Sequence, residues 1–174
     1  AGTAFLGEPR ILVSEDLIEP YLAYLAEAEL NRYPDAGAQE LQQTLRDLMD
    51  IPEGLNILLG NGSDELIQLL ALACDTGDTI LSVEPSFVMY EMIAKFTRLN
   101  YKGVMLDEDF EIDLDAALAT IEQTQPKLIF ISYPNNPTGN AFDRDAIKKI
   151  IEASDALVVV DEAYIDFTDR ASMI

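Results

Sequence analysis

The stretch from Lys127 to Tyr164 constrains the fold more than any other part of this sequence. It reads KLIFISYPNNPTG, continues through a polar segment with helical periodicity, and ends in ALVVVDEAY. Two short apolar runs rich in β-branched residues, separated by a helix, are typical of a strand–helix–strand unit with parallel strands. In open sheets, ligands bind beyond the carboxyl ends of the strands. We therefore expect chemistry at the edge that carries Asn135, Asn136, Asp161 and Tyr164.

The rest of the chain alternates the same two patterns. Further short apolar runs predict strands at 57–59, 79–83 and 102–106. Amphipathic segments predict helices at about 14–30, 38–49, 65–74, 87–98, 112–123 and 143–153. Five strands alternating with helices predict an α/β fold with a mostly parallel sheet and helices on both faces. Residues 1–13 are expected to form an irregular arm.

Composition excludes several classes of function. The 174 residues include 32 acidic and 11 basic ones, for a net charge of −21. Such a surface repels nucleic acid and anionic membranes. The absence of histidine removes the commonest metal ligand and general base, so no metal site is expected. A single cysteine, Cys74, cannot form an internal disulfide, which suits the cytoplasm, and no apolar run is long enough to span a membrane.

The turn Gly60–Gly62, between a predicted strand and a predicted helix, resembles an anion-binding loop. Its glycines allow a sharp turn, and the unpaired amides of Ser63 and Asp64 at the helix N-terminus face an anion. The turn also half-matches the dinucleotide-binding fingerprint, with Glu84 placed as a ribose-binding acid. Glu65 stands where that fingerprint has its third glycine and obstructs close packing. A dinucleotide-binding oxidoreductase domain stays open as an alternative.

The loop Pro134–Gly139 is more constrained than an ordinary turn. Pro134 and Pro137 fix φ around Asn135 and Asn136, which holds two amide side chains at the sheet edge. A connecting loop needs no such rigidity, so this loop is predicted to be a binding site.

Four motifs together resemble the pyridoxal-phosphate-dependent aminotransferases of the aspartate-aminotransferase fold. They are, in chain order, Asn31–Pro34, Gly62–Ile67, Tyr133–Gly139 and Asp161–Tyr164. Within that family their spacing is most similar to the histidinol-phosphate aminotransferases. The resemblance extends over about residues 14–174, and it implies a fold, a cofactor and a role for each site residue.

The resemblance implies four contacts to the ring of pyridoxal phosphate. Asp161 would pair with the ring nitrogen and keep it protonated, so that the ring can accept electrons. Asn136 and Tyr164 would hydrogen-bond the phenolic oxygen of the ring. Phe87 would stack on the ring face.

The resemblance also implies a phosphate site shared between subunits. Ser63 and Asp64 would offer backbone amides to the cofactor phosphate. Tyr33 would reach the phosphate of the neighbouring subunit's cofactor, which implies a homodimer.

The likeness further implies how the chain divides. Residues 1–33 would form an N-terminal arm and first helix, and residues 34–174 an incomplete large, cofactor-binding domain. The Schiff-base lysine and the small domain of the family would follow Ile174. The chain is therefore expected to be a fragment that is inactive alone and prone to aggregate through unpaired strand edges.

No lysine in the chain is placed to substitute for the Schiff-base lysine. Lys148 and Lys149 fall in the middle of a predicted helix, and Lys127 begins a strand at the opposite end from the predicted site.

The expected activity of the parent protein is transfer of an amino group between L-histidinol phosphate and 2-oxoglutarate, in histidine biosynthesis. Two alternatives stay open within the same fold: a related class I/II transaminase and an amino-acid phosphate decarboxylase. Most substrate-binding residues of the family would follow Ile174, so the sequence does not distinguish these activities.

Overall fold

The computed structural model describes residues 15–173, with backbone only at residues 15 and 17. Its contacts divide the chain into two units, residues 1–50 and 51–174. The first unit contains helices α1 (Glu15–Glu27) and α2 (Gln39–Leu48), close to the two helices predicted there. The predicted arm at 1–13 lies outside the described residues.

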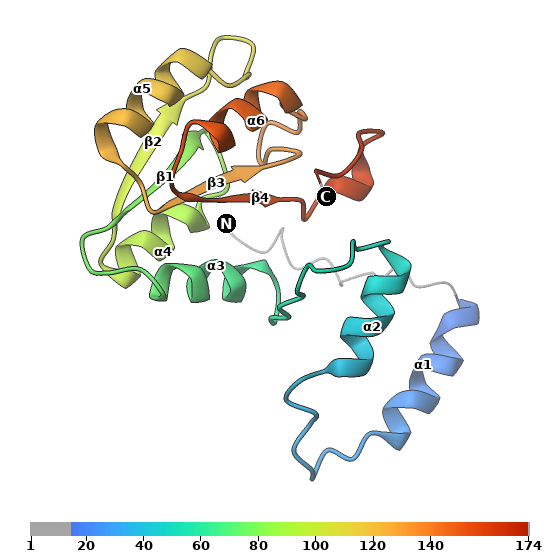
Figure 1. Cartoon of the computed structure of the whole chain (residues 1–174). Helices are drawn as coiled ribbons and strands as arrows, with labels where there is room; N and C mark the ends of the chain where they lie inside the picture. Colours follow the sequence, from blue (N-terminus) through green and yellow to red (C-terminus); the bar gives the residue numbers. More distant parts are fainter. Residues whose placement is uncertain (1–14, 174) are drawn as a thin grey trace, which may run out of the picture. The chain divides into compact units, whose positions relative to one another are not determined.

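The second unit is built on a parallel sheet of four strands (Figure 1). The strands are β1 (Thr79–Glu84), β2 (Asn100–Met105), β3 (Leu128–Ser132) and β4 (Leu157–Asp161). Their order is β2-β1-β3-β4, and every neighbouring pair runs parallel. The chain leaves β1 toward β2 on one side and leaves β3 toward β4 on the other. The strand order therefore reverses between β1 and β3, which is where open sheets of this kind bind ligands.

Helices cover both faces of this sheet (Figure 1). Helices α3 (Ser63–Leu72) and α4 (Met89–Thr97) pack on one face, and α5 (Leu114–Thr124) and α6 (Arg144–Glu152) on the other. A short 3-10 helix, η1 (Ile165–Phe167), follows β4. Among residues 15–173, no helix is long and apolar enough to cross a membrane.

The period of two along each strand sends alternate side chains into two separate cores. In β3, Leu128 and Phe130 pack with α3 and α4, whereas Ile129 and Ile131 pack with α5 and α6. All five residues of this strand are buried, as expected for a central strand of a parallel sheet. The strand that precedes the rigid loop is thereby held on both faces.

The predicted α/β class with a mostly parallel sheet is confirmed, but the predicted strand at 57–59 is wrong. That segment forms no strand, and β2 and β4 stay the edges of the described sheet. A strand is defined by its partner, and no neighbouring strand within residues 15–173 pairs with this segment. An apolar run was sufficient to suggest a strand but could not supply that partner.

Tyr133 provides a test of the core on the α5–α6 face. Its side chain is 0% exposed, and its hydroxyl has no hydrogen-bond partner among the described residues. An unpaired buried hydroxyl costs about 1–3 kcal/mol of desolvation. We expect Tyr133→Phe to leave the free energy of unfolding unchanged or to raise it by about 1 kcal/mol, measured by urea denaturation of the complete protein. A loss of stability would show that the hydroxyl has a partner in the folded protein.

Candidate active site

A buried amide joins the loops that follow β1 and β3. The Asn135 side chain is 2% exposed. Its Nδ2 donates to the carbonyl of Pro85 at 3.0 Å and to Oγ1 of Thr138 at 2.7 Å, and its Oδ1 accepts from the Ser86 hydroxyl at 3.0 Å. Because Pro85 and Ser86 directly follow β1, this one side chain fixes both loops across the reversal in strand order. Asn135 is therefore a structural residue of the site.

The Asp161 carboxylate, at the carboxyl end of β4, is held by two donors. The hydroxyl of Tyr90 donates to Oδ2 at 2.8 Å, and the backbone N–H of Ala163 donates to Oδ1 at 3.1 Å. The carboxylate is only half-buried, and each oxygen keeps a further lone pair. The Asp161 carboxylate is therefore a hydrogen-bond acceptor of fixed orientation that can bind a cationic N–H donor.

Tyr90 lies in the first turn of α4 and is wholly buried. Its ring stacks on Phe130 of β3, with centroids 4.9 Å apart, and meets the ring of Phe87 edge to face at 5.6 Å. Burial raises the pKa of the Tyr90 hydroxyl well above its usual range, and the Asp161 charge raises it further. The hydroxyl therefore stays protonated, as a donor to Asp161, across the physiological pH range.

A second group of site residues lines a hollow of about 270 Å³. It is formed by Pro134–Pro137, Gly139, Tyr164 and Phe167. The Asn136 amide has no hydrogen-bond partner within residues 15–173, whereas the Asn135 amide makes three hydrogen bonds. An amide and a phenol with free hydrogen-bonding capacity thus share one small, open cavity.

The turn before α3 has the shape predicted for it. Gly62 has φ of 85°, a left-handed conformation that favours glycine, and a Cβ on Gly60 would lie 2.8 Å from the Leu66 side chain. The Glu65 carboxylate accepts a hydrogen bond from the backbone N–H of Asn61. Glu65 stands where the dinucleotide-binding fingerprint has its third glycine, which counts against the dinucleotide alternative. The amides at Ser63 start the helix and stay available to a smaller anion.

The structure brings the predicted residues together in part. Phe87 and Asp161 are linked through Tyr90, and Asn136 and Tyr164 line one cavity. Ser63 and Asp64 begin α3. Tyr33 belongs to the first unit and is fully exposed. The cofactor contacts assigned to these residues stay predictions.

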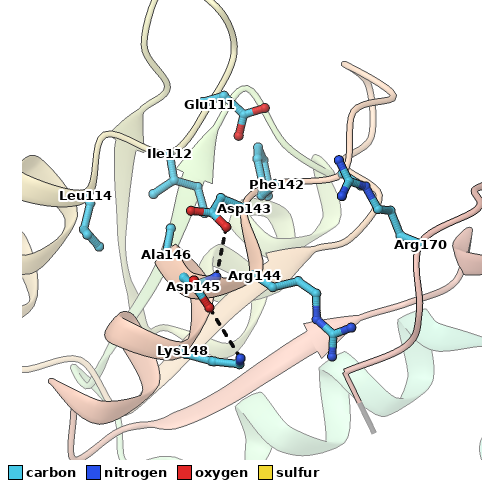
Figure 2. Close-up of a pocket in the computed structure, with 11 residues that line it drawn as sticks. Glu111, Ile112, Leu114, Phe142, Asp143, Arg144, Asp145, Ala146, Lys148 and Arg170 are labelled. Carbon is cyan, nitrogen blue, oxygen red and sulfur yellow. Dashed lines mark hydrogen bonds and ion pairs between the residues drawn. The ribbon is translucent and has the colours of Figure 1, made fainter.

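A larger hollow of the second unit lies elsewhere (Figure 2). It measures about 900 Å³ and lies around the start of α6, where Phe142 forms part of its wall. Three basic and three acidic side chains line it, so its charge is balanced: Arg144, Lys148, Arg170, Glu111, Asp143 and Asp145. None of the predicted site residues faces it. Size alone therefore does not identify the functional site in this chain.

Sequence reasoning assigned a cofactor contact to Asn136 but missed both Tyr90 and the structural role of Asn135. Tyr90 comes three residues after Phe87, the spacing that places two side chains on one helix face. That spacing could have connected it to the site. Nothing in the local sequence separates Asn135 from Asn136, because only the loop geometry decides which amide turns inward.

Comparison with known proteins places these features in a family. Residues 6–173 match the family model described as aminotransferase class I and II. A histidinol-phosphate aminotransferase from Vesicomyosocius okutanii is 62% identical over 156 residues, which cover 90% of this chain and 44% of that protein. This chain therefore spans less than half the length of that relative.

Solved structures share the fold. The histidinol-phosphate aminotransferase from Clostridium acetobutylicum superposes with a TM-score of 0.77 at 26% identity, over 90% of this chain and 46% of that one. The enzyme of the same name from Sinorhizobium meliloti, solved in complex with pyridoxal-5'-phosphate, gives a TM-score of 0.75 at 23% identity, over 86% and 41%. The second likeness supports the fold alone.

The two adjacent asparagines yield a matched prediction. Asn135→Ala removes three hydrogen bonds from a buried amide and should lower the free energy of unfolding by about 2–4 kcal/mol. Asn136→Ala removes none and should change it by less than about 0.5 kcal/mol. Denaturant titration of the complete protein checks both variants. Equal losses would contradict the structural role assigned to Asn135.

The raised pKa of Tyr90 predicts a pH dependence of stability. A phenol whose folded pKa lies above its unfolded value of about 10 stabilises the fold fully below pH 10, and this contribution is lost as the pH rises further. Tyr90→Phe lacks this group, so its stability should fall less steeply than that of the wild type between pH 10 and 11. Urea denaturation at stepped pH measures the two slopes, and parallel slopes would contradict the assignment.

Proposed function

Because this chain belongs to the class I and II aminotransferase family, we propose that the protein carrying it transfers amino groups with pyridoxal phosphate as cofactor. The observation that supports this most directly is the Asp161 carboxylate, held by Tyr90 and Ala163 at the carboxyl edge of the sheet. A negative group of fixed orientation at that edge is suited to the protonated nitrogen of a pyridine ring.

The described residues fit this cofactor on chemical grounds. When bound, pyridoxal phosphate supplies the carbonyl that receives the amino group and a ring that accepts electrons from the substrate. Asp161 holds a proton on the ring nitrogen by ion pairing. Asn136 and Tyr164 provide the free amide and hydroxyl for the phenolic oxygen, and Phe87 offers an aromatic face.

The phosphate of the cofactor fits the start of α3. Three features favour an anion there: the glycine turn, the free amides at Ser63 and Asp64, and the positive end of the helix dipole. We assign the exposed Tyr33 to the phosphate bound by a second copy of the chain, in a cytoplasmic homodimer. In this assignment residues 1–33 form the arm and first helix, and residues 34–174 belong to the cofactor-binding domain.

We assign the substrates as L-histidinol phosphate and 2-oxoglutarate, in histidine biosynthesis. The support is the name of the relative that is 62% identical, together with the four motifs in their order. A panel of amino donors tests the assignment in the complete protein. Fastest transfer from histidinol phosphate is expected. Preference for another donor would indicate a related transaminase, and release of CO₂ without amino transfer would indicate a decarboxylase.

The Asp161→Asn variant tests the role of the carboxylate. It preserves the size of the side chain and removes its charge, so proton retention on the ring nitrogen should weaken. We expect turnover by the complete protein to fall at least about a hundredfold, which corresponds to ~2.7 kcal/mol in the barrier. The unfolding midpoint of the variant is the control for folding. Near-normal turnover in a folded variant would rule out this role.

A further inference from the structure

We propose that Tyr90 is the positioning residue of this site, because its hydroxyl orients the Asp161 carboxylate while its ring orients Phe87. The inference rests on the proposed function and extends it to a residue that contacts neither the substrate nor the cofactor. Its basis is one wholly buried side chain in direct contact with two predicted cofactor contacts from different segments of the chain.

The hydroxyl controls the plane of the carboxylate. The last torsion of an aspartate side chain is broad, so the backbone alone does not set the direction in which its oxygens point. With one donor on Oδ2 from Tyr90 and another on Oδ1 from Ala163, both oxygens are engaged and rotation of the group is opposed. The remaining lone pairs then point in a defined direction. Without the Tyr90 hydroxyl, the backbone N–H of Ala163 would be the one remaining hydrogen-bond donor to the group among residues 15–173.

The ring of Tyr90 controls Phe87 in the same way. Phe87 is half-buried just beyond β1, and the ring of Tyr90 meets it at an interplanar angle of 86°. Tyr90 is itself fixed by stacking on Phe130, a fully buried residue of β3, at 10° between planes. Phe130, in a central strand of the sheet, therefore holds Tyr90 in place, and Tyr90 in turn restrains the Phe87 ring and the Asp161 carboxylate.

The chemistry of the residue supports a role beyond packing. A phenylalanine would stack on Phe130 and meet Phe87 equally well, and it would avoid the cost of burying a hydroxyl. The hydroxyl is compensated by its bond to an ionised acceptor, which is stronger than a bond between neutral groups. What the tyrosine adds over phenylalanine is thus a hydroxyl that donates to Asp161 at 2.8 Å and also interacts with Ser132.

Affinity for pyridoxal phosphate tests the proposal in the complete protein. Tyr90→Phe removes only the hydroxyl, and we expect its dissociation constant for pyridoxal phosphate, measured by calorimetry on cofactor-free protein, to rise about tenfold, or ~1.4 kcal/mol. Tyr101→Phe is the matched control. Tyr101 packs against the same core, and its hydroxyl interacts with Ser82 and Glu84 and makes no contact with Asp161. It should leave the affinity unchanged within about twofold, ~0.4 kcal/mol.

A double-mutant cycle separates positioning from a general loss of structure. In the Asp161→Asn background, the further change Tyr90→Phe should have less effect on affinity than in the wild type, because the contact it removes is already altered. Equal effects in both backgrounds would overturn the proposal. So would unchanged affinity in Tyr90→Phe while Asp161→Asn binds weakly. If the wild type itself does not bind pyridoxal phosphate, the proposed function fails first, and the inference with it.

A structure of the loaded wild-type protein gives an answer that depends on no variant folding. We expect the Tyr90 hydroxyl to lie within hydrogen-bonding distance of Oδ2 of Asp161. The remaining lone pairs of the carboxylate should face the ring nitrogen. A hydroxyl turned toward another partner would overturn the proposal.

Discussion

The parallel pairing of β3 with β4 is the constraint from which the site follows. Its register sets Ser132 beside Asp161, and the Tyr133 N–H donates to the Asp161 carbonyl at 2.8 Å. Neighbouring strands lie about 4.8 Å apart, so the rigid loop after β3 and the carboxylate that ends β4 emerge side by side. A shift of one residue would turn Asp161 to the other face of the sheet, away from Tyr90.

Two buried side chains then fix the segments that this register brings close together. Asn135 joins the loop after β3 to the loop after β1, and Tyr90 joins the start of α4 to the end of β4. Each spans a gap between segments that the backbone ladder does not connect. The residues proposed to contact the cofactor are consequently supported by polar groups that make internal hydrogen bonds. A site that must hold a planar ring between a carboxylate and an aromatic face needs this second set of contacts.

Much of this arrangement could be predicted from the sequence. The strand–helix–strand pattern around Lys127–Tyr164 predicted parallel strands and the edge at which polar residues gather, because apolar runs and their polar ends are local signals. The family could be recognised from four motifs in order. The strand at 57–59 could not be judged in this way, because strand formation depends on a partner distant in sequence. The inward turn of Asn135 and the contact from Tyr90 to Asp161 also depend on tertiary packing, which no local pattern specifies.

In the proposed site, Asp161 faces the pyridine nitrogen of bound pyridoxal phosphate and keeps it protonated. Nitrogen-15 NMR of the complete protein loaded with ring-labelled cofactor measures this state directly. We expect the chemical shift of a protonated pyridine nitrogen in the wild type at neutral pH, and a shift toward the unprotonated value in Asp161→Asn. An unprotonated ring nitrogen in the wild type, or a signal unchanged by the substitution, would contradict this role of Asp161.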